Sequence, residues 1–243
     1  MDRLIYTAVS GANRSLTQQM IHANNLSNAS TEGFRADLEQ ANSQQVLGYG
    51  YASRFQVRSF NGGVDMTHGS LQNTGRELDV AIQGNGLFAV RQGGREAYTR
   101  NGHMEIDDAG NLTINQNPVL GINGPVQLPP FSSVSIGQDG TITVVPENGD
   151  VKAAFDVERI KLVDIPAARL TKNADGLLVT NQAANPRSEN VSVVSAHLES
   201  SNVSAVNEMV ETVSLSRQFE AQIKMMKVAE SLANAGNRLI RGS

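Results

Sequence analysis

Apolar side chains recur every three or four residues along the first part of the chain. The stripe comprises Leu4, Ile5, Ala8, Ala12, Leu16, Ala23 and Leu26. This spacing predicts an amphipathic helix. Because the stripe holds only about two apolar positions per heptad, it is closer to the seam of a coiled coil than to the broad apolar face of a globular helix.

A second stripe of the same kind occupies the end of the chain. It comprises Val206, Met209, Val210, Val213, Phe219, Ile223, Met226, Ala233 and Ile240. No Pro or Gly lies between Val203 and Ala235, so the pattern predicts one helix of roughly 30 residues and about 45 Å. Ser204 precedes it and is suited to the N-cap, since its hydroxyl can accept from the first free amides.

Between the two stripes the pattern changes to short β-branched runs such as "TITVV" and "GLLVT", separated by turn residues. These features predict a central antiparallel β domain. Pairs rich in Gly, Asn and Asp predict hairpin turns with positive φ. The predicted turns are Gly84-Asn85-Gly86, Asn101-Gly102, Asp139-Gly140 and Asp175-Gly176.

The chain is therefore predicted to have an α+β fold. The N- and C-terminal helices are expected to pair as a coiled coil, an axial inner layer, around a central antiparallel all-β domain. Segment 40–63 is expected to be extended and partly mobile. The expected parts are a helix with an Asn-rich motif (1–34), a connector (35–64), the β domain (65–190), and a strand or linker with the second helix (191–243).

Composition removes several classes of protein. The chain of 243 residues has no cysteine, a net charge of −4 and only 5% aromatic residues. Disulfides and thiolate chemistry are therefore excluded, and nothing favours binding to nucleic acid. No apolar run reaches the roughly 18 residues of a membrane span. The first residues lack the pattern of a signal peptide.

The candidate chemistry is sparse. The four histidines, His22, His68, His103 and His197, stand in separate contexts without metal-ligand spacing. "GNGLF" precedes β-type sequence rather than the helix of a phosphate loop. "DDAGNL" lacks the ligand pattern of a calcium-binding EF-hand. We expect no catalytic residue, no cofactor and no metal, and hence no enzyme.

The Asn-rich stretch "HANNLSNASTEGFRAD" (residues 22–37) follows the first helix. Such side chains compete for the backbone and are typical of helix ends, and Gly33 would then be a positive-φ stop. The alternative is that some of the amides contact another subunit, because amides within a seam fix register and partner choice. The pattern alone leaves both interpretations open.

Three motifs carry a resemblance to a known family. "ANNLSNASTEGFRAD" resembles the N-terminal signature of the bacterial flagellar rod and hook proteins, with Ser27 for the common Ala and Arg35 for the common Lys. "LQNTGRELDVAIQGNGLFAV" and "AYTRNGHMEIDDAGNL" resemble the central motif, and "LESSNVSAVNEMVETVSLSRQFEAQIKMM" resembles the C-terminal helix motif. Proximal-rod proteins are the best match, and distal-rod or hook paralogues are the alternative.

The resemblance implies a structural subunit that self-associates through its terminal helices. Such subunits pass through the flagellar type III export apparatus, join other proximal and distal rod proteins, and build the periplasm-spanning rod of the basal body that transmits torque. Neither nucleic acid nor membrane insertion is implied. By analogy, the subunit-interface motif comprises Asn24, Asn25, Leu26, Asn28, Thr31, Gly33, Phe34, Ser201, Asn202, Val203, Glu208, Met209, Arg217 and Phe219.

A rival hypothesis is a secreted β protein that processes or binds glycans. A glycan hydrolase needs two carboxylates in one cleft, and the sequence contains no distinctive pair. A carbohydrate-binding module needs an aromatic platform, but the chain has no Trp and only 4 Tyr.

Overall fold

The computed structural model describes residues 2–45, 55–147, 149 and 153–241 and has an α+β architecture. It divides into two compact units. The helix unit comprises Met1–Ser27, Asp37–Gly62 and Ser204–Ser243, and the β unit comprises Asn28–Ala36 and Gly63–Val203.

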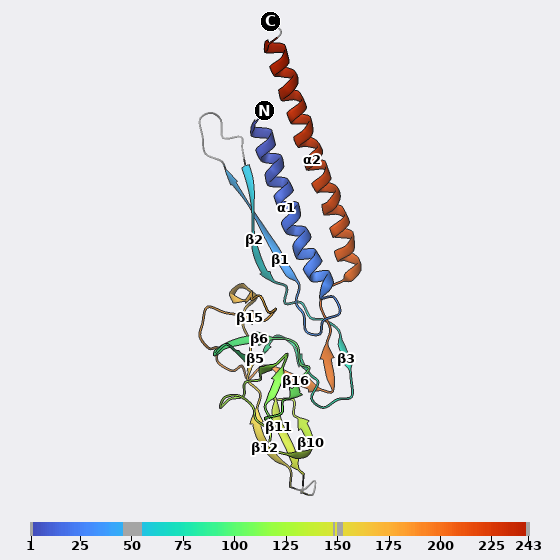
Figure 1. Ribbon diagram of the computed structural model, residues 1–243. Helices are drawn as coiled ribbons and strands as arrows, with labels where there is room; N and C mark the ends of the chain where they lie inside the picture. The colour runs from blue at the N-terminus through green and yellow to red at the C-terminus, as the bar shows by residue number, and fades with distance from the viewer. Residues whose placement is uncertain (1, 46–54, 148, 150–152, 242–243) are drawn as a thin grey trace. The chain divides into compact units, whose positions relative to one another are not determined.

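Both predicted terminal helices are present. They are α1, Asp2–Ser27, and α2, Ala205–Arg241, and they lie side by side within the helix unit (Figure 1). Helix α2 is longer than predicted because it continues through Gly236. A single glycine costs a helix only about 1 kcal/mol, so it does not end one that is otherwise sound.

Small side chains form the buried seam of α1. Ala8, Ala12 and Ser15 are buried, and Gly11 lies between them. A Cβ added to Gly11 would come within 3.0 Å of the side chain of Gln222 on α2. The two helices therefore approach closely where α1 carries its smallest residues. By contrast, Leu16, a member of the predicted stripe, is exposed.

The region predicted to be a connector contains two strands. They are β1, Asp37–Gln45, and β2, Phe55–Val64, and they pair as a two-stranded sheet. The prediction of mobility for 40–63 falls partly on residues 46–54, which lie outside the described residues.

The β unit is built from short strands. The pairs that these strands form in the described part of the chain are antiparallel. The strands are β3 Leu71–Asn73, β4 Val80–Gln83, β5 Leu87–Gln92, β6 Arg95–Thr99, β7 Glu105–Ile106, β8 Leu112–Ile114, β9 Asn117–Pro118, β10 Phe131–Ile136, β11 Thr141–Pro146, β12 Phe155–Arg159, β13 Leu162–Val163, β14 Thr171–Lys172, β15 Leu178–Val179, β16 Ser192–Ser195 and β17 His197–Glu199, with a short 3₁₀ helix η2 at Ala167–Arg169.

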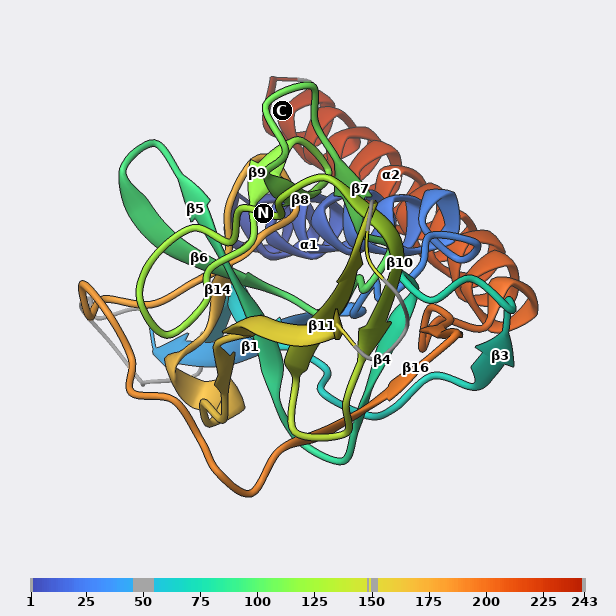
Figure 2. The same cartoon turned by 90° about the horizontal axis from the view of Figure 1, so that it is seen from below.

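The largest sheet has the strand order β13-β5-β6-β15-β14. Its centre is the β5–β6 hairpin, visible at the edge of the unit in Figure 2. Gly93 and Gly94 close this hairpin with positive φ, which glycine adopts at little cost. A second sheet, β10-β11-β12, packs side chains into the larger of the unit's two apolar cores, and strand β5 contributes side chains to that core as well.

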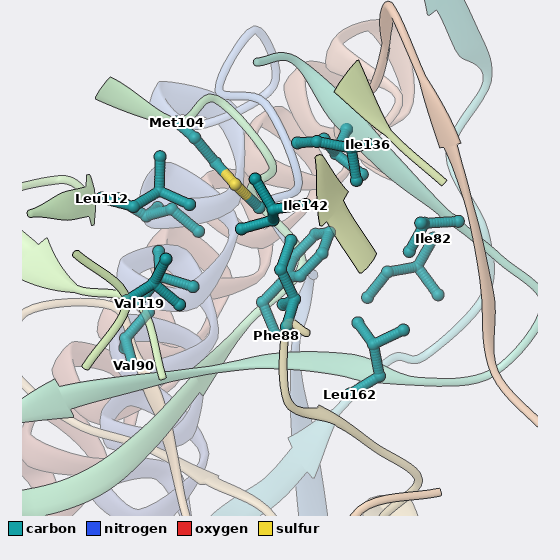
Figure 3. Packing of buried hydrophobic residues seen from close by; sticks show 14 of the residues in the cluster. Ile82, Phe88, Val90, Met104, Leu112, Val119, Ile136, Ile142 and Leu162 are labelled. Carbon is teal, nitrogen blue, oxygen red and sulfur yellow. The ribbon is translucent and has the colours of Figure 1, made fainter. Parts of the chain in front are cut away.

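Strand β5 is buried on both faces. Phe88 and Val90 belong to the larger apolar core, whereas Leu87 and Ala89 belong to a smaller second core. Because successive strand residues point to opposite faces, the continuous apolar run "GLFAV" supplies both cores. Figure 3 shows Phe88 packed among the side chains of the larger core, close to Ile142.

Three of the four predicted turns have the expected backbone. Gly84, Gly140 and Gly176 all have positive φ. The prediction for Asn101-Gly102 is wrong, because Gly102 is not a positive-φ residue. A Cβ there would lie 1.6 Å from the carbonyl oxygen of Val80. Gly102 is needed for close backbone approach beside the bridge between Asp79 and His103, not for a hairpin reversal.

Candidate functional site

The chain's two terminal motifs meet inside the β unit. The amide of Gly33 donates to the carbonyl of Glu199 at 2.7 Å, and the amide of Asn202 donates to the carbonyl of Phe34 at 3.4 Å. We call this region the terminal junction. It comprises residues 28–36 and 197–203 with Asp65, Thr67, His68, Gly69, Arg100 and Lys172.

Gly33 sits where no other residue fits. Its φ is +65°, and a Cβ would lie 2.2 Å from the backbone nitrogen of Asn101. The sequence predicted a positive-φ stop after the first helix, and the positive φ is confirmed. The close approach to another part of the chain could not be predicted from local sequence.

Asn202 links three separate segments through its side chain. Its Oδ1 accepts from the amide of Ala36 at 2.8 Å, and its Nδ2 donates to the carbonyls of Asp65 at 3.0 Å and Thr67 at 3.2 Å. An Asn side chain has one acceptor and two donors, and here both kinds of group are used. Asn202 therefore fixes how the strand leading to the last helix enters the junction.

Glu199 is the charged centre of the junction. Its Oε1 accepts from Nη2 of Arg35 in a short ion pair and from the amide of Gly69 at 3.0 Å. Its Oε2 accepts from Nε of Arg100 at 2.8 Å. The side chains of all three ionised residues are 1% exposed. A buried charge group of this kind persists only when its hydrogen bonds are made.

Arg100 extends this network to the turn before β5. Its Nη1 donates to the carbonyls of Gly84 and Gly86, each at 2.8 Å, and its Nη2 contacts Nδ1 of His68 at 3.1 Å. Burial lowers the pKa of the Arg100 guanidinium, and the carboxylate of Glu199 opposes that effect. The arginine thus ties the Gly-Asn-Gly turn to both terminal motifs.

Phe34 and Lys172 close the junction on another side. The Lys172 ammonium lies 3.9 Å from the centroid of the Phe34 ring, a cation–π contact. The same ammonium donates to the carbonyl of Arg35 at 2.7 Å. The N-terminal motif is therefore held by strand β14 as well as by Glu199.

The other predicted residues of the junction make local contacts. The backbone amide of Thr31 donates to the carbonyl of Asn28 at 3.1 Å. The Thr31 hydroxyl donates to the side-chain oxygen of Asn28, also at 3.1 Å. The hydroxyl of Ser201 accepts from the amide of Val203 at 3.2 Å. These bonds form the turns on either side of the junction, and a role for these residues in contacts with other subunits stays a prediction.

In the helix unit, Asn25 serves a structural purpose. Its side chain is buried, accepts from the amide of Asp37 at 2.9 Å and donates to the carbonyl of Asp37 at 3.2 Å. It therefore fixes the start of β1 against α1. Its neighbour Asn24 is exposed, and Leu26 is half-buried.

Glu208, on the predicted C-terminal motif, joins the two helices. Its Oε2 lies 2.5 Å from Nδ1 of His22. Phe219 is half-buried, whereas Met209 and Arg217 are exposed. The last two lie on an open face of α2 together with Val210, Val213, Ser214, Gln218 and Ala221.

Both helices also carry apolar side chains that their own unit leaves uncovered. On α2, Val206 is 71% exposed and Val210 is 62% exposed; on α1, Met20 is 66% exposed. Apolar side chains that gather on one exposed face are characteristic of interaction surfaces. Val206, Met209, Val210 and Val213 share one side of α2 because they follow at spacings of three and four residues. We call these four residues, together with the exposed Met20 of α1, the outward apolar face.

Arg35, Arg100 and Glu199 were not among the residues that sequence analysis selected. Each lies within a recognised motif, but nothing in its neighbours marks it as buried. Arg35 and Glu199 are 164 positions apart in sequence. The signal that the sequence offers for this ion-pair network is that each of the three motifs contains a charged residue.

The loop that was considered as a calcium site uses its carboxylate for hydrogen bonds within the loop. Oδ1 of Asp107, in the loop considered for calcium, accepts from the amides of Ala109 and Asn111. The hydrogen bond from the Asn111 side chain lowers the pKa of this carboxyl. Within the described part of the chain, no three His, Asp or Glu side chains gather as metal ligands. None of the described helices combines the length and apolar character that crossing a bilayer requires.

Comparison with known proteins matches family models to three successive parts of the chain. "Flagella basal body rod protein" matches residues 5–35, "Flagellar hook protein FlgE/F/G D1 domain" matches 81–144, and "Flagellar basal body rod FlgEFG protein C-terminal" matches 190–239. The first match ends at residue 35, inside the terminal junction, and the third match includes the junction residues 197–203.

Full-length relatives agree with these matches. The chain is 36% identical over 248 residues to the flagellar basal-body rod protein FlgF of Escherichia coli K12, and 37% identical over 248 residues to that of Salmonella typhimurium, with 99% of each chain covered. It is 29% identical to FlgG of Bacillus subtilis, with 96% of this chain and 97% of that protein covered. The chain therefore belongs to the bacterial flagellar basal-body rod proteins, is a structural component of the rod, and is FlgF-like within that family.

Proposed function

We propose that this rod subunit assembles by covering the outward apolar face of α1 and α2 with the helices of neighbouring subunits. The observation that carries the proposal is the exposure of Val206, Val210 and Met20 on well-formed helices. Burying apolar surface is worth about 25 cal/mol per Å². An isolated subunit leaves that free energy unused, whereas an assembly of several copies gains it.

In the finer form of the proposal, the terminal helices pair as a coiled coil and form the axial inner layer of the rod. The subunit passes through the flagellar type III export apparatus, joins other proximal and distal rod proteins, crosses the periplasm with them and transmits torque, without catalysing a reaction. Support comes from the family, from the long α2 and from the small-residue seam of α1.

The proposal also assigns different roles to the predicted interface residues. Met209 and Arg217 are exposed on α2, and in this proposal they contact other subunits. Gly33, Phe34 and Asn202 act within the subunit, since their contacts build the terminal junction. The junction's role is then to fix the chain where the two terminal motifs meet the strands.

A complementation experiment tests the proposal. A strain lacking the gene is given the Val210→Asp variant, which places a charge on the outward apolar face where the isolated chain has room for it. We expect loss of swimming in soft agar and shortened rods in electron micrographs of basal bodies. Asn207→Asp is the matched control on the same helix, because Asn207 is exposed and already polar. Full-length rods and normal swimming with Val210→Asp would refute assembly through this face.

A further inference from the structure

A cavity in the β unit stands apart from the terminal junction. It has a volume of about 550 Å³ and lies where the β5–β6 hairpin meets the loop 120–124 and the segment 183–187. That volume is within the range of sites for small ligands, about 300–1,000 Å³. We call it the basic pocket.

Cationic side chains dominate its lining. Four are present, Arg91, Arg95, Lys161 and Arg187, against one carboxylate, Glu96. The chain as a whole carries a net charge of −4. A concentration of positive charge in a hollow of an acidic protein therefore runs against the composition of the chain.

The single carboxylate is already neutralised. Glu96 Oε1 lies 2.5 Å from the Lys161 ammonium, and its Oε2 accepts from the Tyr98 hydroxyl at 2.9 Å. Burial raises the pKa of Glu96, but these hydrogen bonds outweigh it and hold that pKa below its usual value. Glu96 and Lys161 thus form a closed pair, and three arginines remain in the lining.

Arg187 has unused hydrogen-bonding capacity. Its Nη2 donates to the carbonyl of Asp139 at 3.2 Å, and its buried Nε has no partner among the described residues. The carboxylate of Asp139 lies 2.7 Å from Nη2 of Arg159, so it does not neutralise Arg187. The carboxylate of Glu158, beside the pocket, accepts from the side-chain amide of Asn123 at 3.1 Å. Because this amide is neutral, Glu158 is a second carboxylate near the arginines.

We infer that the basic pocket binds a small ligand carrying two or more negatively charged oxygens, as carboxylate or phosphate groups. Guanidinium groups bind both kinds of oxyanion through paired N–H donors. Arg91 pairs with Glu96 and Arg95 pairs with Gln92 in the hairpin, so the two arginine side chains leave opposite faces of the strands. Both are exposed and reach the lining of the pocket, and Arg187 lies at the far segment. This inference is independent of assembly through the helices.

Calorimetric titration of the purified full chain tests it, with inorganic pyrophosphate as the phosphate probe and citrate as the carboxylate probe at constant ionic strength. We expect one of the two to bind, and the tighter probe identifies the kind of group. The Arg95→Gln/Arg187→Gln double variant should weaken that binding by at least about tenfold, because it removes two charged donors. Arg169→Gln, an exposed arginine on η2, is the matched control and should leave it unchanged.

Two results would overturn the inference. One is the absence of binding of either probe up to about 10 mM, weaker than the affinity a multidentate site provides. The other is equal weakening by the double variant and by Arg169→Gln, which would show only a general effect of net charge. Circular dichroism checks the fold of each variant, and the single Arg95→Gln variant decides if the double variant does not fold.

Discussion

Glu199 is the residue on which the terminal junction depends most. It is the carboxylate that Arg35 and Arg100 share, and all three side chains are buried. The Glu199→Gln variant keeps the shape but leaves two buried guanidinium groups without a countercharge. We expect a loss of about 3–5 kcal/mol in the free energy of unfolding of the β unit.

Urea denaturation followed by circular dichroism measures this loss. Glu189→Gln is the control, since Glu189 is an exposed carboxylate of the same unit, and its effect should stay within about 0.5 kcal/mol. Equal unfolding midpoints for the two variants would show that the buried charges do not hold the junction.

Gly33 and Gly75 separate two costs of replacing a glycine. Both have positive φ, +65° and +74°, but a Cβ on Gly75 meets nothing within 4 Å, whereas one on Gly33 lies 2.2 Å from the backbone of Asn101. Gly75→Ala should therefore cost about 1–2 kcal/mol, the price of the left-handed backbone alone. Gly33→Ala should cost about 1–3 kcal/mol more, because the chain must also move apart. Thermal unfolding of both variants compares them; equal losses would mean that the junction yields freely at this point.

At the scale of elements, the seam of α1 is the feature that holds the helix unit together. Ala12 is buried in it, and Asn13, the next residue, is exposed. The Ala12→Asp variant should raise the rate of tryptic cleavage within α2 by at least about tenfold, because a charge buried in the seam costs more than about 1.4 kcal/mol. Asn13→Asp adds the same charge outside the seam and should leave the rate unchanged. Identical cleavage of the two variants would mean that α1 does not protect α2.

The elements themselves were largely predictable from sequence. The spacing of apolar residues predicted both terminal helices and the β-rich middle, since these periods follow from backbone geometry. The faces were harder to predict. Leu16 and Val210 belong to the predicted stripes yet are exposed. On α1, the small residues Ala8, Ala12 and Ser15 form the buried seam instead. The run "GLFAV" predicted a strand but gave no sign that it supplies two cores.

The terminal junction was the least predictable part. The resemblance assigned Gly33, Phe34 and Asn202 to a motif for contacts between subunits, whereas their contacts in the structure lie within the subunit. The pairing of Arg35 with Glu199 arises only when the fold brings distant segments together. Local sequence contains no record of such a pairing, and the same holds for Gly102, whose need for close approach comes from Val80.

At the scale of the whole molecule, the terminal residues are of two kinds. Those of the junction make contacts inside the subunit, and we propose that those of the outward apolar face contact neighbouring subunits. Assembly should therefore change the surroundings of α2 and leave the exposed loops of the β unit accessible.

The absence of cysteine from the chain makes the decisive measurement simple, because a single introduced thiol reports one position. Maleimide labelling is timed for the Val213→Cys variant, on the outward apolar face, and for the Ala174→Cys variant, on an exposed turn of the β unit. We expect both thiols to react rapidly in the purified subunit, and the Val213→Cys thiol alone to become protected in isolated basal bodies. Equally rapid labelling of the Val213→Cys thiol in basal bodies that contain the variant would contradict the proposal that the terminal helices build the rod.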